Sequence, residues 1–132
     1  MIENIPFSTF NVSKRIQKPI LTVILINPDT GAKQPCYSLI DTGASECVFP
    51  GYMAFLLGHN LEKGTSVLID GINSKIQAWM HMTTMVVNDI KIGTAPVYYV
   101  NGLEMGLIGE RNFLSKFTLE INYPKKIFSI RK

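Results

Sequence analysis

Metal ligands and long apolar runs are scarce in this sequence of 132 residues. It has two cysteines and two histidines, and none of them stands at the spacing of zinc ligands, so we expect no structural metal and no cofactor. The most apolar stretch near the start, residues 20–26, is far shorter than the roughly 20 residues of a membrane helix. We therefore expect no membrane partner.

The start of the sequence has neither a basic beginning nor a long apolar run, so we expect no signal peptide. Cys36 and Cys47 are too far apart for a CxxC pair, so we expect them to be free thiols. These features predict a cytoplasmic protein.

Positive charge is present only in small excess. The formal net charge is +3, and part of the excess lies at the C-terminus, at Lys125, Lys126, Arg131 and Lys132. Aromatic residues do not interleave with lysine and arginine as they do in grooves that bind single strands. We therefore expect no nucleic-acid partner, and a small barrel that binds nucleic acid is a weaker alternative.

Short β-branched segments dominate the chain and predict strands at about residues 20–26, 35–40, 65–69, 76–87, 90–92, 95–100, 118–121 and 127–131. Turn formers separate them. Good helix formers predict one short helix at 51–57, and one or two helical turns could follow at 111–116. With 46% apolar and 17% charged residues, the composition is that of a globular protein, and we expect one all-β domain over 1–132 with a core at about 18–131.

A candidate catalytic loop follows the second predicted strand. Asp41 comes directly after the apolar residues Leu39 and Ile40, and residues 48–50 are apolar again, so core strands hold the loop on both sides. Gly43 permits close backbone approach, and Thr42 offers a hydroxyl that can link neighbouring loops. We expect a rigid site built around the Asp41 carboxylate.

Residues 39–45, Leu-Ile-Asp-Thr-Gly-Ala-Ser, resemble the catalytic motif of the retropepsin-like aspartic proteases. Further likenesses follow in the family's order: Asp70–Ser74 resembles the tip of the flap hairpin, Leu107–Gly109 the second signature, and Asn112–Leu114 the start of a helix. Together they span about residues 20–131. The resemblance implies an all-β barrel with a flap hairpin and one short helix.

Two departures from the family pattern stand out. Glu110 and Arg111 separate the second signature from Asn112, where the family often has one residue, so the register of the helix and any ion pair of Arg111 stay open. The flap tip holds only Gly71, where retroviral enzymes have several glycines.

The resemblance implies an aspartic endopeptidase that cleaves peptides or proteins, with Asp41, Thr42 and Gly43 as its catalytic residues. The residues that would contact substrate are Ala44, Ser45, Glu46, Gly71, Ile72, Asn73, Ser74 and Ile108. Hydrolysis needs two carboxylates, because one accepts a proton from water while the other donates to the scissile carbonyl. One chain offers one suitable aspartate, so we expect a homodimer in which Asp41 of two copies shares the water.

A second Asp-Thr-Gly-Ala tetrapeptide begins at Asp29. Pro28 precedes it and the polar residues Lys33 and Gln34 follow, which is typical of a hairpin turn and not of a buried catalytic loop. Asp70 and Asp89 also lie in predicted turns. Asp41 is therefore the sole catalytic candidate among these aspartates.

Several alternatives remain open. The chain could be a protease-fold module that dimerises or binds peptides without cleaving them.

Other candidate residues carry weaker signals. No histidine is identifiably placed to activate Ser45, and Cys47 is more simply a buried hydrophobe than a nucleophile. Residues 79–85 contain Trp79 and three methionines, which could line a substrate site. Methionine and aromatic side chains on strands belong to the core more often than to a substrate site. The last strand, 127–130, could interleave between subunits or form an edge of the monomer.

Overall fold

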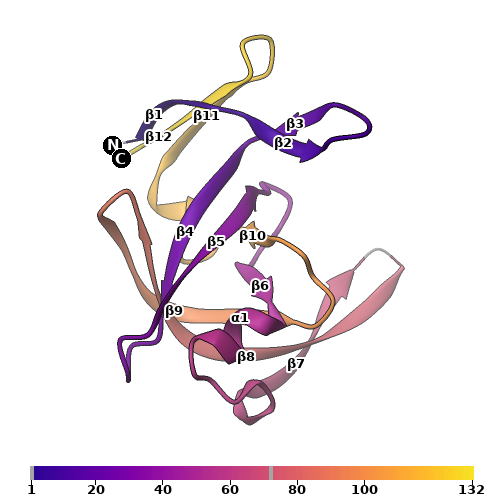
Figure 1. The fold of residues 1–132 in the computed structure, drawn as a ribbon, viewed down its shortest axis with the longest axis vertical. Coiled ribbons are helices and arrows are strands. Elements are labelled where there is room, and N and C mark those ends of the chain that lie inside the picture. The colour runs from indigo at the N-terminus through magenta and orange to yellow at the C-terminus, as the bar shows by residue number, and fades with distance from the viewer. Residues whose placement is uncertain (1, 72) are drawn as a thin grey trace.

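The computed structural model describes residues 2–71 and 73–132 and is built mainly of strands (Figure 1). The strands are β1 Ile2–Pro6, β2 Ser8–Asn11, β3 Ile16–Lys18, β4 Ile20–Ile26, β5 Lys33–Ile40, β6 Val48–Pro50, β7 Thr65–Gly71, β8 Ser74–Val87, β9 Ile90–Val100, β10 Gly106–Ile108, β11 Thr118–Asn122 and β12 Ile127–Arg131. The helical segments are α1 Gly51–Leu56 and the 3-10 turns η1 Leu61–Lys63 and η2 Leu114–Lys116. The predicted all-β class is confirmed.

Seven strands form a sheet that closes on itself. Their order is β4-β5-β10-β6-β9-β8-β7, and β4 also pairs with β8 through Ile24–Val86 and Leu25–Met85. This second pairing turns six of the strands into a barrel and leaves β7 as a branch on β8. The apolar side chains that alternate along β4 and β9 fill the interior.

The candidate catalytic loop is positioned by a strand from a distant part of the sequence. β10 lies between β5 and β6, parallel to β5 and antiparallel to β6. The chain segment 41–47 connects β5 to β6 and must therefore pass over the end of β10. This crossing brings the second signature against the Asp41 loop.

The predicted hairpin with its tip at Asp70–Ser74 is confirmed as β7–β8, and it extends beyond the barrel (Figure 1). Gly71 pairs with Ser74 at its tip, and Asn73 there has a φ of +62°, which asparagine tolerates better than most residues. Closer to the barrel, β8 leaves β7 and pairs with β9 and β4. Val67 and Ile69 on the inner face of β7 pack against the apolar cluster around Val48.

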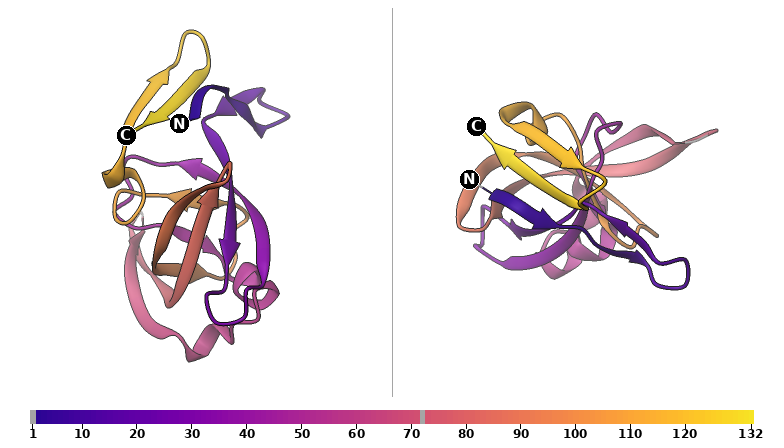
Figure 2. Two further views of the ribbon diagram at one scale, coloured as in Figure 1. Left: turned by 90° about the vertical axis from the view of Figure 1, so that its left-hand side faces the viewer. Right: turned by 90° about the horizontal axis from the view of Figure 1, so that it is seen from above.

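A separate sheet at one end of the molecule holds both termini (Figure 2). Its order is β1-β12-β11, so β12 is a central strand and the alternative that it forms an edge of the monomer is wrong. Ile2 and Phe128 of this sheet are buried and belong to the main core cluster. The sequence interpretation assigned no strand before residue 20 and thus missed β1 and the β2–β3 hairpin.

The helical predictions are confirmed for α1 and only partly for the segment after Gly109. Residues 110–113 form a turn, and only Leu114–Lys116 is helical, as a 3-10 turn. Asn112 has a φ of +66°, which a continuous right-handed helix cannot include. The helix start expected at Asn112–Leu114 is therefore corrected to a turn followed by η2.

The cysteines and the methionine-rich segment contribute mainly to packing. Cys36 and Cys47 are free and buried, and burial raises the pKa of Cys47 to about 11. Met85 is fully buried, whereas Met82 is about half exposed.

Among the described residues, no helix has the length and apolar character needed to cross a membrane.

Candidate functional site

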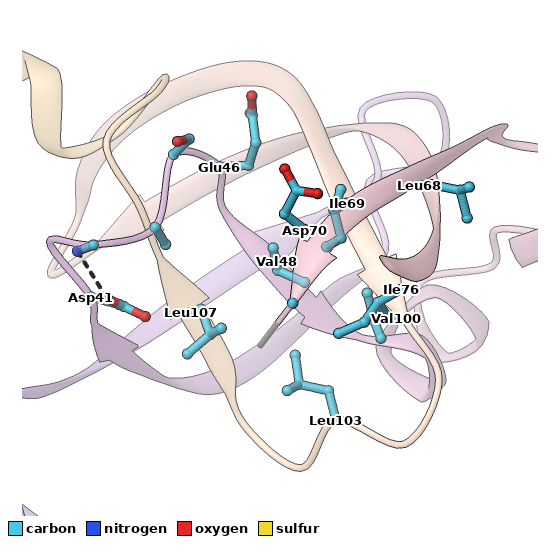
Figure 3. Close-up of a pocket in the computed structure, with 14 residues that line it drawn as sticks. Asp41, Glu46, Val48, Leu68, Ile69, Asp70, Ile76, Val100, Leu103 and Leu107 are labelled. Atoms are coloured by element: carbon cyan, nitrogen blue, oxygen red, sulfur yellow. Dashed lines mark hydrogen bonds between the residues drawn. The ribbon is translucent and has the colours of Figure 1, made fainter. Parts of the chain in front are cut away.

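Asp41 lies immediately after the end of β5 and is fixed by its backbone. Its N–H donates to the carbonyl of Ile108 at 3.0 Å, and its own carbonyl accepts from the N–H of Ala44 at 3.1 Å. Its Oδ1 accepts from the Gly43 N–H at 3.0 Å (Figure 3). These three bonds close a tight turn that holds the carboxylate in one orientation.

Gly109 braces this turn from the second signature. A Cβ at this position would lie 2.7 Å from the Glu46 carbonyl carbon and 2.8 Å from the Ala44 oxygen, distances that no side chain can occupy. The next two N–H groups bind the same loop: Glu110 donates to Ala44 and Arg111 to Ser45, each at 2.9 Å. The glycine of the second signature is thus needed for close backbone approach.

The ion pair left open by the sequence joins Arg111 to Glu46, with Nη1 and Oε1 2.9 Å apart. The Glu46 side chain is 20% exposed and the Arg111 side chain 68% exposed. The segment after Gly109, one residue longer than the family pattern, therefore still places a cation beside the Asp41 loop.

A cleft of about 720 Å³ opens beside Asp41. The Asp41–Glu46 loop forms one side and the tip of the β7–β8 hairpin another, as Figure 3 shows. Its lining residues are Asp41, Gly43, Ala44, Ser45, Glu46, Val48, Leu68, Ile69, Asp70, Gly71, Ile76, Val100, Leu103 and Leu107. Most of these are aliphatic, so the cleft suits apolar side chains next to a carboxylate.

The cleft brings together six of the residues predicted from the sequence, which are Asp41, Gly43, Ala44, Ser45, Glu46 and Gly71. Thr42 is exposed outside the lining, and Asn73 and Ser74 are exposed at the hairpin tip. Ile108 is fully buried in the core, and its neighbour Leu107 lines the cleft instead. Ile72 lies outside the described residues.

Other lining residues escaped the sequence interpretation. Val48 begins β6, and Val100 and Leu103 lie at and just after the end of β9. The local pattern placed residues 48–50 next to the Asp41 loop, but it connects neither Val100 nor Leu103 with Asp41. Leu107 could have been found from the sequence. Successive side chains of a strand face opposite sides, so when Ile108 points into the core, its neighbour Leu107 points away from it towards the cleft.

The three carboxylates of the cleft differ in their partners. Glu46 is paired with Arg111, and Asp70 is paired across the hairpin with Lys75 at 2.7 Å. The hydrogen bond from Lys75 lowers the pKa of Asp70. Within residues 2–71 and 73–132, Asp41 has no ion-pair partner, so it is the cleft carboxylate whose charge is not balanced by a neighbouring cation.

The second Asp-Thr-Gly-Ala tetrapeptide lies in the turn between β4 and β5. Asp29 is exposed, its N–H donates to the side chain of Asn27 at 2.9 Å, and Gly31 has a φ of +78°. The hairpin-turn interpretation of this tetrapeptide is confirmed. The part of the chain that the structure describes has no group of three or more histidine, cysteine, aspartate or glutamate side chains that could hold a metal ion.

Comparisons with known proteins point to one fold. No family model matches the sequence, and no curated protein matches it closely enough to count as a relative. A retropepsin-like aspartic protease from Rickettsia conorii matches with a TM-score of 0.61 and 19% identity, over 83% of this chain and 89% of that one. The EIAV protease in complex with the inhibitor HBY-793 matches with a TM-score of 0.55 and 18% identity, over 78% of this chain and 88% of that one. The chain therefore has the retropepsin-like fold that its motifs implied.

Proposed function

We propose that this chain, which has the retropepsin-like fold, is an aspartic endopeptidase that acts as a homodimer. One observation carries the proposal: Asp41 stands at the side of an apolar cleft, fixed by backbone hydrogen bonds and without a neutralising cation among the described residues. A carboxylate in such a place is available for proton transfer. The two protease structures of the same fold support this assignment.

The second carboxylate would come from another copy of the chain. Glu46 and Asp70 already have cationic partners, and neither is held at the end of a core strand as Asp41 is. A two-fold axis beside the cleft would bring Asp41 of the partner subunit against the first and let the pair share one proton. The dimer is thus a requirement of the proposed chemistry.

Cleavage would proceed by direct attack of water on the peptide bond. The ionised member of the pair takes a proton from the water while the protonated member donates its proton to the scissile carbonyl oxygen, and the new C–O bond gives a tetrahedral diol. Collapse of the diol breaks the C–N bond as the amine leaves with a proton. The two Asp41 side chains supply both proton transfers, so the route needs no cofactor.

The remaining predicted residues would serve substrate binding and dimer contact. The Gly43 N–H orients the carboxylate, and the exposed Thr42 hydroxyl is free to contact the partner subunit. The β7–β8 hairpin, here called the flap, would cover an extended peptide, with Gly71, Asn73 and Ser74 at its tip. Closure would exclude water from the cleft. The two free cysteines fit the cytoplasmic location proposed from the sequence.

A protease-fold module that binds peptides without cleaving them is the second candidate, and one experiment separates the two. A mixed peptide library would be incubated at pH 4–7 with wild type and with Asp41→Asn. The chain offers a matched control in Asp29→Asn, which changes the same tetrapeptide in the β4–β5 turn.

The peptidase proposal predicts cleavage by wild type and by Asp29→Asn, and none by Asp41→Asn. Sedimentation would show whether each variant forms the dimer. A dimeric wild-type protein that binds peptides but leaves them intact would establish the binding module instead. A wild type that cleaves while monomeric at every concentration would refute the shared-carboxylate mechanism.

A further inference from the structure

The two histidines of the chain lie against each other at the base of the flap. The His59 and His81 rings are stacked, with centroids 4.5 Å apart and planes inclined by 29°. His81 belongs to β8, whereas His59 lies between α1 and η1. The contact therefore joins one flap strand to the segment that leads into the other.

Both rings are placed by their neighbours. His81 Nε2 lies 2.9 Å from the Leu61 carbonyl, so that nitrogen carries a proton and donates it. The backbone N–H of His59 donates to the Ala54 carbonyl at the end of α1, at 2.9 Å. His59 Nε2 is buried and has no hydrogen-bond partner among the described residues. A proton gained by the His59 ring would thus create a poorly solvated cation.

The surroundings disfavour that cation. Burial is the first cause that lowers the pKa of His59, and His81 is the second, while Asp29 in the β4–β5 turn acts in the opposite direction. Tyr99 of β9 meets both rings, and its hydroxyl is engaged with Thr83. Tyr52 of α1 lines the same pocket as His59, and the charged residues of η1, Glu62 and Lys63, are exposed.

The stack sits where it can control the flap. Gly64, the residue before β7, lies so close to β8 that a Cβ on it would collide with the Met80 carbonyl and the His81 ring. The His81–Leu61 hydrogen bond adds a second link between β8 and η1. Separation of the rings would remove one of the contacts that hold the base of β7 against β8.

We propose that the His59–His81 stack is a pH-sensitive latch, closed when the His59 ring is neutral and opened when that ring is protonated, that sets how freely the flap moves. A protonated His59 ring would lie stacked on His81, and its buried Nε2 would have no hydrogen-bond acceptor among the described residues. The latch concerns the conformation of the flap and does not depend on whether the chain cleaves peptides.

The direction of the pH effect follows from linkage. A histidine whose pKa is lowered in the closed state stabilises that state above its ordinary pKa of about 6.5, and this stabilisation is lost as the pH falls below that value. Each pKa unit between the closed and open states changes the opening equilibrium by up to about tenfold. The flap would loosen in the acidic range where a shared-proton carboxylate pair can work.

Hydrogen exchange of the full-length protein tests the latch. Exchange of the amides of β7 and of the β7-paired part of β8 would be compared at pH 7.5 and 5.0, corrected for the intrinsic chemical rate. We expect flap opening to increase by about tenfold at the lower pH in wild type. His59→Phe keeps an aromatic ring in the stack without a titrating group, and it should remove most of that increase.

An NMR titration of the wild type provides a second readout that needs no variant to fold. The chain has two histidines and one tryptophan, Trp79 of β8, so the ring signals are few. A histidine that titrates below pH 6.5 together with a shift of the Trp79 indole signal supports the latch. Flap exchange that is unchanged between the two pH values, or an equal increase in His59→Phe, would overturn it.

Discussion

Replacement of Gly109 by alanine should damage both the stability of the protein and the geometry of its candidate site. The new Cβ would be 2.7 Å from the Glu46 carbonyl carbon and 2.8 Å from the Ala44 oxygen. Both are backbone atoms, so no side-chain rotation can relieve the collision. The Asp41 loop would have to move away from β10.

The cost can be worked out from the contacts that are lost. Overpacking of a close contact costs about 1–3 kcal/mol. Separation of the loop from β10 also breaks the Glu110–Ala44 and Arg111–Ser45 backbone bonds, each of which contributes about 0.5–1.5 kcal/mol. We therefore expect the free energy of unfolding to fall by about 2–6 kcal/mol, and Tm to fall by about 8 °C or more.

Thermal and urea unfolding followed by circular dichroism would measure this loss, and peptide cleavage well below Tm would measure its effect on the site. A displacement of about 1 Å at Asp41 should lower kcat by about a hundredfold. Gly31→Ala is the control, since Gly31 has a φ of +78° and open space around it, so this change adds only backbone strain of about 1–2 kcal/mol. If Gly109→Ala were no less stable than Gly31→Ala and fully active, the bracing role of Gly109 would be refuted.

Three further changes test other parts of the fold. Tyr99→Phe should lower the free energy of unfolding in urea by about 1–3 kcal/mol, because it leaves the buried Thr83 hydroxyl without its 2.7 Å partner. The double variant with Thr83→Val should recover part of this loss, and full stability of Tyr99→Phe would contradict the prediction. Arg111→Ala removes the cation paired with the Glu46 carboxylate, so cleavage of a peptide library by this variant should prefer lysine or arginine at one peptide position about tenfold more than wild type does. An unchanged preference would exclude Glu46 from substrate contact. Burial raises the pKa of Cys47 to about 11, so the stability that the neutral thiol contributes is present below pH 9 and is lost as the pH rises towards 11. In urea unfolding, Cys47→Ala should therefore lose less stability than wild type between these pH values. An equal loss in the variant would argue against a role for the Cys47 thiol.

The terminal sheet bears on how two copies would meet. β12 is paired on both sides within one chain, with β1 and with β11. Interleaving of C-terminal strands between subunits would require β1 to leave β12, which would give up the Asn4–Ser129 hydrogen bond and the Glu3–Arg131 ion pair. The dimer proposed here must either exchange β1 between subunits or use other edges of the sheet.

Local features of the sequence were enough for much of the fold. Turn formers mark the β4–β5 turn and the flap tip, where Gly31 and Asn73 adopt positive φ. The apolar residues before Asp41 predicted that a core strand ends at the carboxylate, and β5 ends there. The helical turns predicted at 111–116 were only partly right, because Asn112 has a positive φ. That φ depends on how the chain turns back after Glu110 and Arg111 bind the Asp41 loop, which local sequence does not encode.

The sequence by itself determined which carboxylate stands in a rigid loop, because the strands that flank Asp41 and the polar turn around Asp29 are local properties of the chain. Only the tertiary structure decided what surrounds that carboxylate. The insertion of β10 between β5 and β6 selects Leu107 over Ile108 for the cleft and brings Arg111 to Glu46. The barrel likewise stacks His59 on His81, since contacts between residues distant in sequence depend on strand order, which no local pattern encodes.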